Sequence, residues 1–238
     1  AIMGAGAQMG TPVQAADDYS NSAVNIAPNN LAGKQYGNTV DKNSVVVGYQ
    51  NTTRQENGAV ADGEGHFIFG ANNRASAASS LAIGNNNVAT GGGSTAIGAS
   101  SKATKAAALA VGNIARAEAT GATAIGTHAN ADKDGNSLTV GEYSTAVGGW
   151  TNASGTNASA FGYKAQATGD FSVAVGVETE ANKNNAVAIG RVSKATGTSA
   201  TAIGVNNKAQ ADDSSAVGSS NTIAAAATQA SAFGRENT

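Results

Sequence analysis

Side chains that could bind a metal ion are few in this sequence. The 238 residues include two histidines, His66 and His128, and no cysteine. A zinc site needs three or four nitrogen, sulfur or oxygen ligands around one ion, so carboxylates would have to join the histidines. Because the two fall in different repeats of the pattern described below, we predict two separate surface histidines, no metal site and no cofactor.

A second candidate for metal binding is the segment DKDGNSLTVGEY, residues 132–143. Its acidic residues Asp132 and Asp134 match the first and third positions of a calcium-binding EF-hand loop. The glycine required at the sixth position is replaced by Ser137, and the glutamate required at the twelfth by Tyr143. We therefore expect a polar surface loop here and no calcium site.

Catalytic motifs are also missing from the sequence pattern. The glycine run at residues 91–93 is not followed by the Gly-Lys-Ser or Gly-Lys-Thr of a phosphate-binding loop. Serine is common, but no spacing indicates a Ser–His–Asp set. The net charge of −2 provides no field that would attract nucleic acid or an anionic membrane. We expect a protein that is not an enzyme and binds no nucleic acid.

A repeat of fourteen residues positions every one of these side chains. A short apolar phrase ending in glycine recurs, and nine of its twelve intervals are 14 residues. Two intervals are 22 residues and the last is 16. The glycine that ends each phrase is called the marker glycine: Gly48, Gly70, Gly84, Gly98, Gly112, Gly126, Gly148, Gly162, Gly176, Gly190, Gly204, Gly218 and Gly234.

The composition of each repeat predicts β-structure. An Ile, Val or Phe precedes the marker glycine, and alanine recurs two residues before it and five residues after it. Recurring glycine and β-branched residues disfavour a helix. Fourteen residues suit two short strands and two tight turns, stacked coil upon coil at a spacing of about 4.8 Å. We predict an all-β solenoid.

The alanine and isoleucine columns of each phrase are adjacent, so they should face opposite sides of a strand. A strand that is apolar on both faces is usually covered on both. We predict that another copy of the chain packs closely against the alanine column, as in a homo-oligomer. The alternative is an alanine stripe that simply faces solvent.

Two sets of side chains could bind a ligand on the outside of such a solenoid. Four residues after a marker glycine stand Arg74, Lys102, Arg116, Lys194 and Lys208. Because neighbouring coils stack, Lys102 should lie over Arg116 and Lys194 over Lys208, which would favour an anionic ligand such as a sulfated glycan. The alternative is a solvated column balanced by Glu118 and Glu180.

The second candidate is an aromatic patch formed by Trp150, Tyr163 and Phe171. Exposed aromatic side chains often anchor partners. The alternative is that these residues cover the roll where the second long interval disturbs it.

The recurring phrases, from LAIG at residues 81–84 to SAFG at residues 231–234, resemble the head repeats of YadA-like trimeric autotransporter adhesins of Gram-negative bacteria. The resemblance covers about residues 44–234. It implies a left-handed parallel β-roll, three chains packed side by side, and display on the cell surface. It also implies host cells, extracellular-matrix proteins, cell-surface glycans or other bacteria as partners. Because neck, coiled-coil and membrane-barrel motifs are not found, we expect the stalk and anchor to lie outside this sequence.

The domain organisation follows from where the period fails. Residues 1–43 fit it poorly and are predicted to form an atypical N-terminal cap, since a solenoid end needs one. Residues 44–238 form the head repeats, with insertions near 54–63 and 132–141. Each insertion ends in a Gly-Glu pair seven residues before the next marker glycine.

We therefore predict an adhesin head that binds by many weak surface contacts. One alternative is a structural spacer that trimerises but binds nothing. The other is a left-handed solenoid acyltransferase, although the fourteen-residue period is not a multiple of the six-residue repeat of that class.

Overall fold

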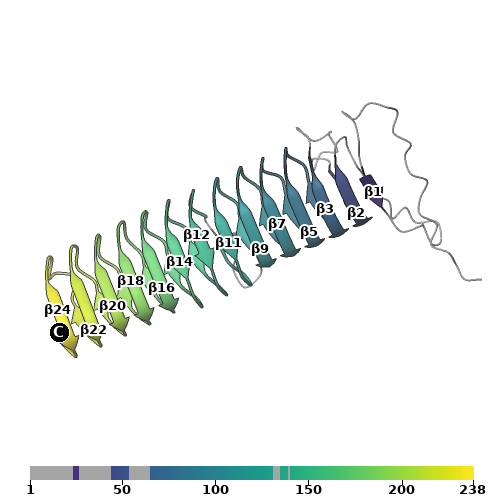
Figure 1. Cartoon of the computed structure of the whole chain (residues 1–238). Helices are drawn as coiled ribbons and strands as arrows, with labels where there is room; N and C mark the ends of the chain where they lie inside the picture. Colours follow the sequence, from purple (N-terminus) through teal and green to yellow (C-terminus); the bar gives the residue numbers. More distant parts are fainter. Residues whose placement is uncertain (1–23, 27–43, 54–64, 131–134, 139) are drawn as a thin grey trace, which may run out of the picture.

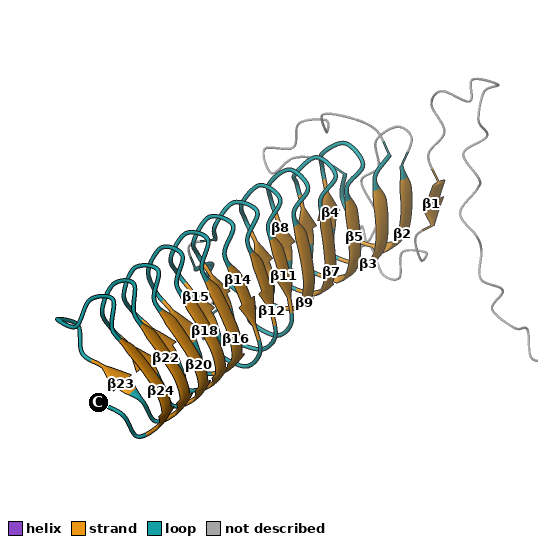
Figure 2. Ribbon diagram, turned by 60° about the vertical axis from the view of Figure 1, so that its left-hand side comes forward, coloured by secondary structure: helices purple, strands orange, loops and turns teal. Residues whose placement is uncertain are grey.

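The computed structural model describes residues 24–26, 44–53, 65–130, 135–138 and 140–238. Within these residues the chain forms a parallel β-solenoid of about 14 residues per coil, without a helix (Figures 1 and 2). The predicted all-β solenoid is confirmed. In the described part of the chain no helix is long and apolar enough to cross a membrane.

One strand of each coil belongs to a large parallel sheet of 14 strands. Its register keeps the repeat in step, since Ala188 pairs with Ala202 and Gly190 with Gly204. Its strands, in order, are β1 (Val24–Ile26), β2 (Val45–Tyr49), β3 (Phe67–Ala71), β5 (Leu81–Asn85), β7 (Thr95–Ala99), β9 (Leu109–Asn113), β11 (Thr123–Ile125), β12 (Thr145–Val147), β14 (Ser159–Phe161), β16 (Val173–Val177), β18 (Val187–Arg191), β20 (Thr201–Val205), β22 (Ser215–Ser219) and β24 (Ser231–Arg235).

Most coils have a second strand of two residues, which lies in one of two smaller parallel sheets. The first contains β4 (Arg74–Ala75), β6 (Val88–Ala89), β8 (Lys102–Ala103) and β10 (Arg116–Ala117). The second contains β13 (Asn152–Ala153), β15 (Gln166–Ala167), β17 (Glu180–Ala181), β19 (Lys194–Ala195), β21 (Lys208–Ala209) and β23 (Thr222–Ile223).

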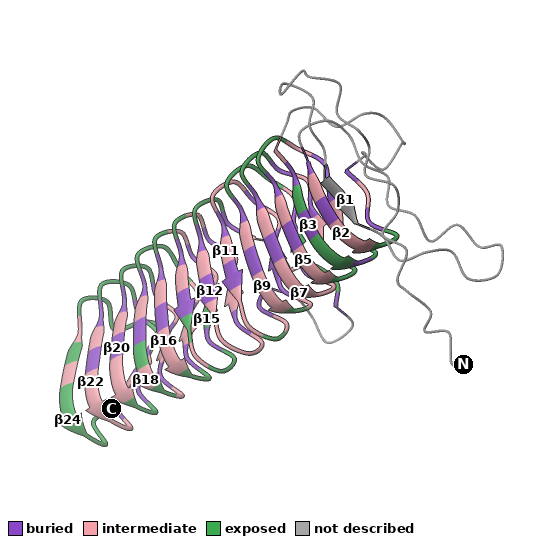
Figure 3. Ribbon diagram, turned by 45° about the vertical axis from the view of Figure 1, so that its right-hand side comes forward, coloured by how far each residue is buried: buried purple, intermediate pink, exposed green. Residues whose placement is uncertain are grey.

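The interior between the sheets is built mainly from alanine. Ala188 on the large sheet and Ala195 on the small sheet are both fully buried, as are their equivalents in neighbouring coils. Figure 3 shows these buried positions as a line across the strands, with exposed residues gathered along the turns. Longer side chains fill the same column of the large sheet only in its first coils, where Val46 and Ile68 are fully buried.

The alanine column of the large sheet therefore does not contact another copy, and that prediction was wrong. Ala188 and Ala202 are 0% exposed inside their own chain. The Ile, Val or Phe before each marker glycine instead lies on the outer face, as Ile189 does. Both columns are apolar, so hydrophobicity alone could not tell them apart. From Ala82 onward the interior takes the smaller side chain of the two.

The marker glycines allow neighbouring coils to approach closely. Gly190 has φ of 121°, and a Cβ added to it would lie 1.9 Å from the carbonyl oxygen of Gly204 in the next coil. Neither the backbone conformation nor the space accepts a side chain. This is why the apolar phrase in each fourteen-residue repeat ends in glycine.

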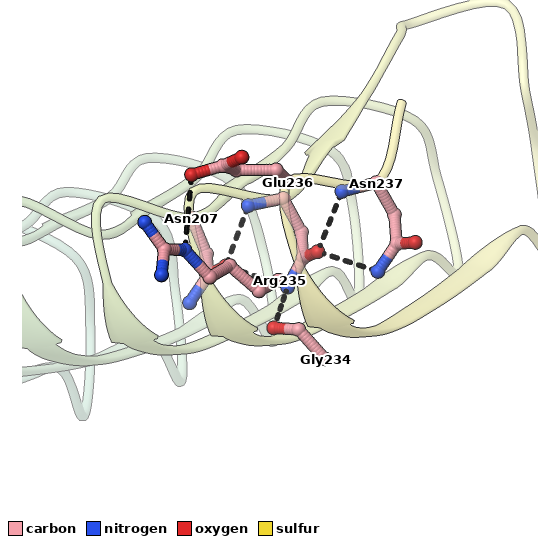
Figure 4. Close-up of polar contacts among 6 residues, drawn as sticks. Asn207, Gly234, Arg235, Glu236 and Asn237 are labelled. Carbon is pink, nitrogen blue, oxygen red and sulfur yellow. Dashed lines mark hydrogen bonds and ion pairs between the residues drawn. The ribbon is translucent and has the colours of Figure 1, made fainter.

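Buried asparagines connect coils through their side chains. The amide nitrogen of Asn87 donates to the carbonyl of Gly98 at 2.7 Å, and its amide oxygen accepts from the backbone N–H of Ser101 at 3.0 Å. The same ladder runs from Asn207 to Asn237 at the C-terminal end of the roll (Figure 4). Each amide thus satisfies a buried donor and a buried acceptor in the next coil.

The second long interval interrupts the small sheet but not the large one. The strands β11 and β12 pair directly across it, whereas β10 and β13 belong to different small sheets. Asn130 supports the break, because its side-chain oxygen accepts from Ala153 N at 2.8 Å and its carbonyl accepts from Leu138 N at 2.9 Å.

Several predicted segments fall outside the described residues. These are residues 54–64, residues 131–134 with Asp132 and Asp134, and the predicted cap apart from β1. The strand β1 pairs in parallel with β2.

Candidate binding surfaces

The predicted basic column lies along the two small sheets, on the side opposite to the buried alanines. Lys102 is exposed, and Arg74, Lys194 and Lys208 are half-buried. The predicted register is confirmed, since Lys102 pairs with Arg116 and Lys194 with Lys208. The insertion divides the column, with Arg74 and Lys102 on one small sheet and Lys194 and Lys208 on the other.

One lysine of the column is already paired. The Nζ of Lys194 lies 2.6 Å from Oε1 of Glu180, which is in the neighbouring coil. Both side chains are partly exposed, so the pair contributes little to stability but reduces the local positive charge. Lys102 and Lys208 form no ion pair with any described residue. They are the members of the column best placed to meet an anion.

Arg116 does not belong to the exposed surface, and the structure corrects that prediction. It is 7% exposed, and its Nε and Nη2 donate to the carbonyl of Gly135 at 3.1 and 2.6 Å. Its Nη1 donates to the carbonyl of Ser100. Desolvation lowers the pKa of Arg116, and the negative charge of Glu118 partly opposes this lowering. The guanidinium nevertheless stays charged, as it does in proteins generally. Arg116 therefore connects Gly135 of the insertion to Ser100 of the roll.

Trp150 and Tyr163 lie together, on the turns that lead from the large sheet to the small sheet. Trp150 stacks on His128 of the preceding coil, with ring centroids 4.2 Å apart and planes at 2°. The ring of Tyr163 covers the backbone of Gly149 and carries the Nζ of Lys164 at 5.2 Å from its centroid. Lys164 therefore places a cation beside this aromatic pair.

Phe171 is not part of that patch. It lies between β15 and β16, on the turn that leads from the small sheet back to the large one, while Trp150 precedes β13. Tyr143 occupies the equivalent turn position two coils earlier and was not predicted as a binding residue. Aligning the repeats on the marker glycine would have revealed it, since both stand five residues before that glycine.

The outer face of the large sheet is a continuous apolar surface. The residues before the marker glycines alternate with the alanines and point away from the interior. Most of them are half-buried, and the four most exposed are Ile189, Phe69, Phe161 and Phe233, at 36%, 38%, 39% and 67%. Neighbouring positions add Phe67, Val177 and Val205. An exposed apolar surface of this extent is typical of a protein–protein interface.

The histidines differ from the prediction of two surface side chains. His66 is fully buried, and its Nδ1 is 3.1 Å from Oγ of Ser80. His128 is half-buried against Trp150. In the part of the chain that the structure describes, no three His, Asp or Glu side chains are grouped so that they could hold a metal ion.

The comparison with protein families agrees with the geometry. The model of the YadA head domain repeat matches overlapping segments from residue 69 to residue 221, which together make up more than half of the chain. The matched segments are 69–87, 75–101, 89–115, 103–129, 117–138, 140–165, 153–179, 167–193 and 195–221. No curated protein matches the chain.

Proposed function

The chain belongs to the YadA head family of trimeric autotransporter adhesins, and we propose that it is an adhesin head that attaches a Gram-negative bacterium to its target surface. The family is one of adhesins and not of enzymes. The supporting observation in the fold is a long stack of coils that repeats each surface column along its length. Weak contacts to repeated side chains add up without a deep pocket.

We further propose that three chains assemble through the apolar outer face of the large sheet. Ile189, Ile203 and Val217 form part of a column on this face and are paired in register between neighbouring strands. Burying such a column between chains removes apolar surface from water at about 25 cal/mol per Å². The small sheets, with the basic column, then remain accessible for binding.

The ligand-binding residues that we propose are Arg74, Lys102, Lys194, Lys208, Trp150 and Tyr163. Arg116 is removed from this set because its guanidinium is used within the chain. The partners are extracellular-matrix proteins, cell-surface glycans or receptors, or other bacteria.

The function is tested by attachment. The purified oligomer is immobilised on beads and offered matrix proteins, sulfated glycans, host cells and partner bacteria at low and high salt. Binding to at least one target supports an adhesin. Binding that falls with salt and with Lys102→Ala and Lys208→Ala assigns it to the basic column. A stable trimer that binds none of them indicates a structural spacer instead.

A further inference from the structure

Two largely exposed aromatic side chains lie along one edge of the roll. Tyr143 and Phe171 are 60% and 59% exposed. They lie on the turns that return to the large sheet, away from the column before the marker glycines. The backbone bonds Asn157 N to Glu142 O and Phe171 N to Thr156 O place Asn157 on the coil between them.

Their backbone conformation makes the choice of aromatic residues costly. Tyr143 has φ of 54° and Phe171 has φ of 56°. Bulky residues are rarely found there, and a left-handed conformation costs a non-glycine residue about 1 kcal/mol or more. In the other coils this turn position holds Gly, Ala, Ser, Asn, Asp or Gln. Because the rings are mostly exposed, burial does not offset that cost.

The local arrangement leaves each ring available to a ligand. The ring of Tyr143 lies over the backbone of Gly121, where an added Cβ would be 2.5 Å from Cδ1 of the tyrosine. Glycine on that coil therefore lets the ring lie flat along the edge. Two coils separate Tyr143 from Phe171, which is about 10 Å at a strand spacing of about 4.8 Å.

Polar groups between and beside the rings identify the ligand class. The side chain of Asn157, which is exposed on the coil between the two aromatic residues, offers amide donors and an acceptor. Glu142 and Asp170 directly precede the two aromatics, and Oδ1 of Asp170 accepts from Thr156 N at 2.9 Å. Carboxylates accept hydrogen bonds from hydroxyl groups but repel sulfates and other anions. This combination suits a neutral sugar chain, whose C–H faces pack on aromatic rings while its hydroxyls bond to amides and carboxylates.

We propose that the edge formed by Tyr143, Asn157 and Phe171 binds an extended neutral oligosaccharide, with two of its sugar rings packed on the two aromatic rings. This site rests on the proposed adhesin function and defines one ligand class for it. It is distinct from the basic column, which would take an anion, and from Trp150 and Tyr163 on the opposite turns. Three copies in a trimer would add avidity.

The test uses the whole chain and neutral oligosaccharides of glucose, galactose and N-acetylglucosamine as probes, measured by calorimetry and saturation-transfer NMR. The variants are Tyr143→Asn, Phe171→Asn and the double variant. Asparagine accepts the left-handed conformation and already occupies this turn position at Asn157 and Asn185, so folding should be preserved or improved. Ser199→Asn, at the same turn position two coils beyond Phe171, is the matched control.

We expect at least one neutral probe to bind, each single variant to weaken binding roughly tenfold, and the double variant to abolish it, as for the loss of anchoring residues. Ser199→Asn should bind like the wild type. The proposal is overturned if no neutral probe binds or if the double variant binds the neutral probes normally. It is also overturned if the variants lose binding only to a sulfated heparin fragment or to a collagen-like peptide. If the wild type still attaches to cells in any of those cases, the proposed adhesin function is kept and only the sugar site is rejected. If it attaches to no cells, both the sugar site and the adhesin function are rejected.

Discussion

The interior position three residues after the marker glycine differs between the two ends of the roll and its middle. At both ends it holds asparagines that form ladders: Asn51, Asn73 and Asn87, and Asn207, Asn221 and Asn237. Towards the middle these give way to Ser101 and Ser193, whose hydroxyls still donate to the next marker glycine carbonyl. The central coils have Ala115, Ala129 and Ala165, and threonine at 151 and 179.

The surface shows the opposite distribution. The central coils carry the insertion held by Arg116, the stacked pair of His128 and Trp150, and the turn aromatics Tyr143 and Phe171. The end coils carry no aromatic residue in these turn positions among the residues that the structure describes. Side-chain ladders therefore reinforce the stacking at the ends, while the middle is held by backbone pairing and close packing and bears the varied surface.

The largest loss of stability is expected from replacing a marker glycine, because the ends and the middle of the roll both need one in each coil. Gly190→Val should abolish folding, since the added Cβ would meet the carbonyl of Gly204 at 1.9 Å in a backbone with φ of 121°. Soluble expression and circular dichroism measure the loss. Gly92→Ala is the control, because nothing lies within 4 Å of a Cβ added there. A folded Gly190→Val protein would show that the coils do not need this close approach.

The ladders should matter next. Asn87→Ala removes the acceptor for Ser101 N and a donor to Gly98 O, both between coils. Leaving a buried donor unsatisfied should lower the free energy of unfolding by about 3 kcal/mol, measured by denaturant titration. Thr151→Ala, at the equivalent central position, should cost less than about 1 kcal/mol, because its hydroxyl bonds only within its own coil, at 3.3 Å to Gly148 O. Equal losses at the two sites would contradict the difference between ends and middle.

A smaller and local effect is expected at the insertion. Arg116→Ala should destabilise the protein by about 2 kcal/mol, since Gly135 O and Ser100 O lose their donors. Hydrogen exchange should show faster exchange of the Leu138 amide, which bonds to Asn130 O in the same segment. The control is Lys102→Ala, because Lys102 is exposed and pairs with Arg116 on the neighbouring strand. This variant should leave the free energy of unfolding and the hydrogen exchange unchanged. Unchanged exchange in Arg116→Ala would mean that the arginine does not hold the insertion.

The smallest effect is expected from the surface ion pair. Lys194→Ala breaks the contact of 2.6 Å with Glu180. Because both groups are partly exposed, unfolding free energy should fall by less than about 1 kcal/mol, and by less still in high salt. A loss of several kcal/mol in denaturant titration would mean that the charged column supports the fold and is not free to serve binding.

The sequence predicted the parts of the structure that stacking imposes. Marker glycines and the alanines five residues later recur because each coil must fit the same space in the stack as the coil before it. The period therefore predicts both the solenoid and the register of its strands. Hydrophobicity could not decide between Ala188 and Ile189 for the interior, because the thickness of the roll makes that choice.

The candidate site depended on features outside the period. The burial of Arg116 comes from the insertion folding over it, which spacing does not reveal. Phe171 and Trp150 are near in sequence but occupy opposite turns of the coil, so the predicted patch was divided. Tyr143 was not predicted as a binding residue, because its place five residues before the marker glycine shows only when the repeats are aligned.

The most direct test of the account is the mass of the purified chain in solution, by native mass spectrometry and by light scattering at micromolar concentration. We expect three chains, because the adhesin family to which the chain belongs is trimeric and the outer face of the large sheet is an exposed apolar surface. Replacing Ile189 and Ile203 by lysine on that face should then dissociate the assembly without unfolding its coils. A stable, soluble wild-type monomer would contradict the central claim that this face is an interface and that the head presents its surface columns in three copies.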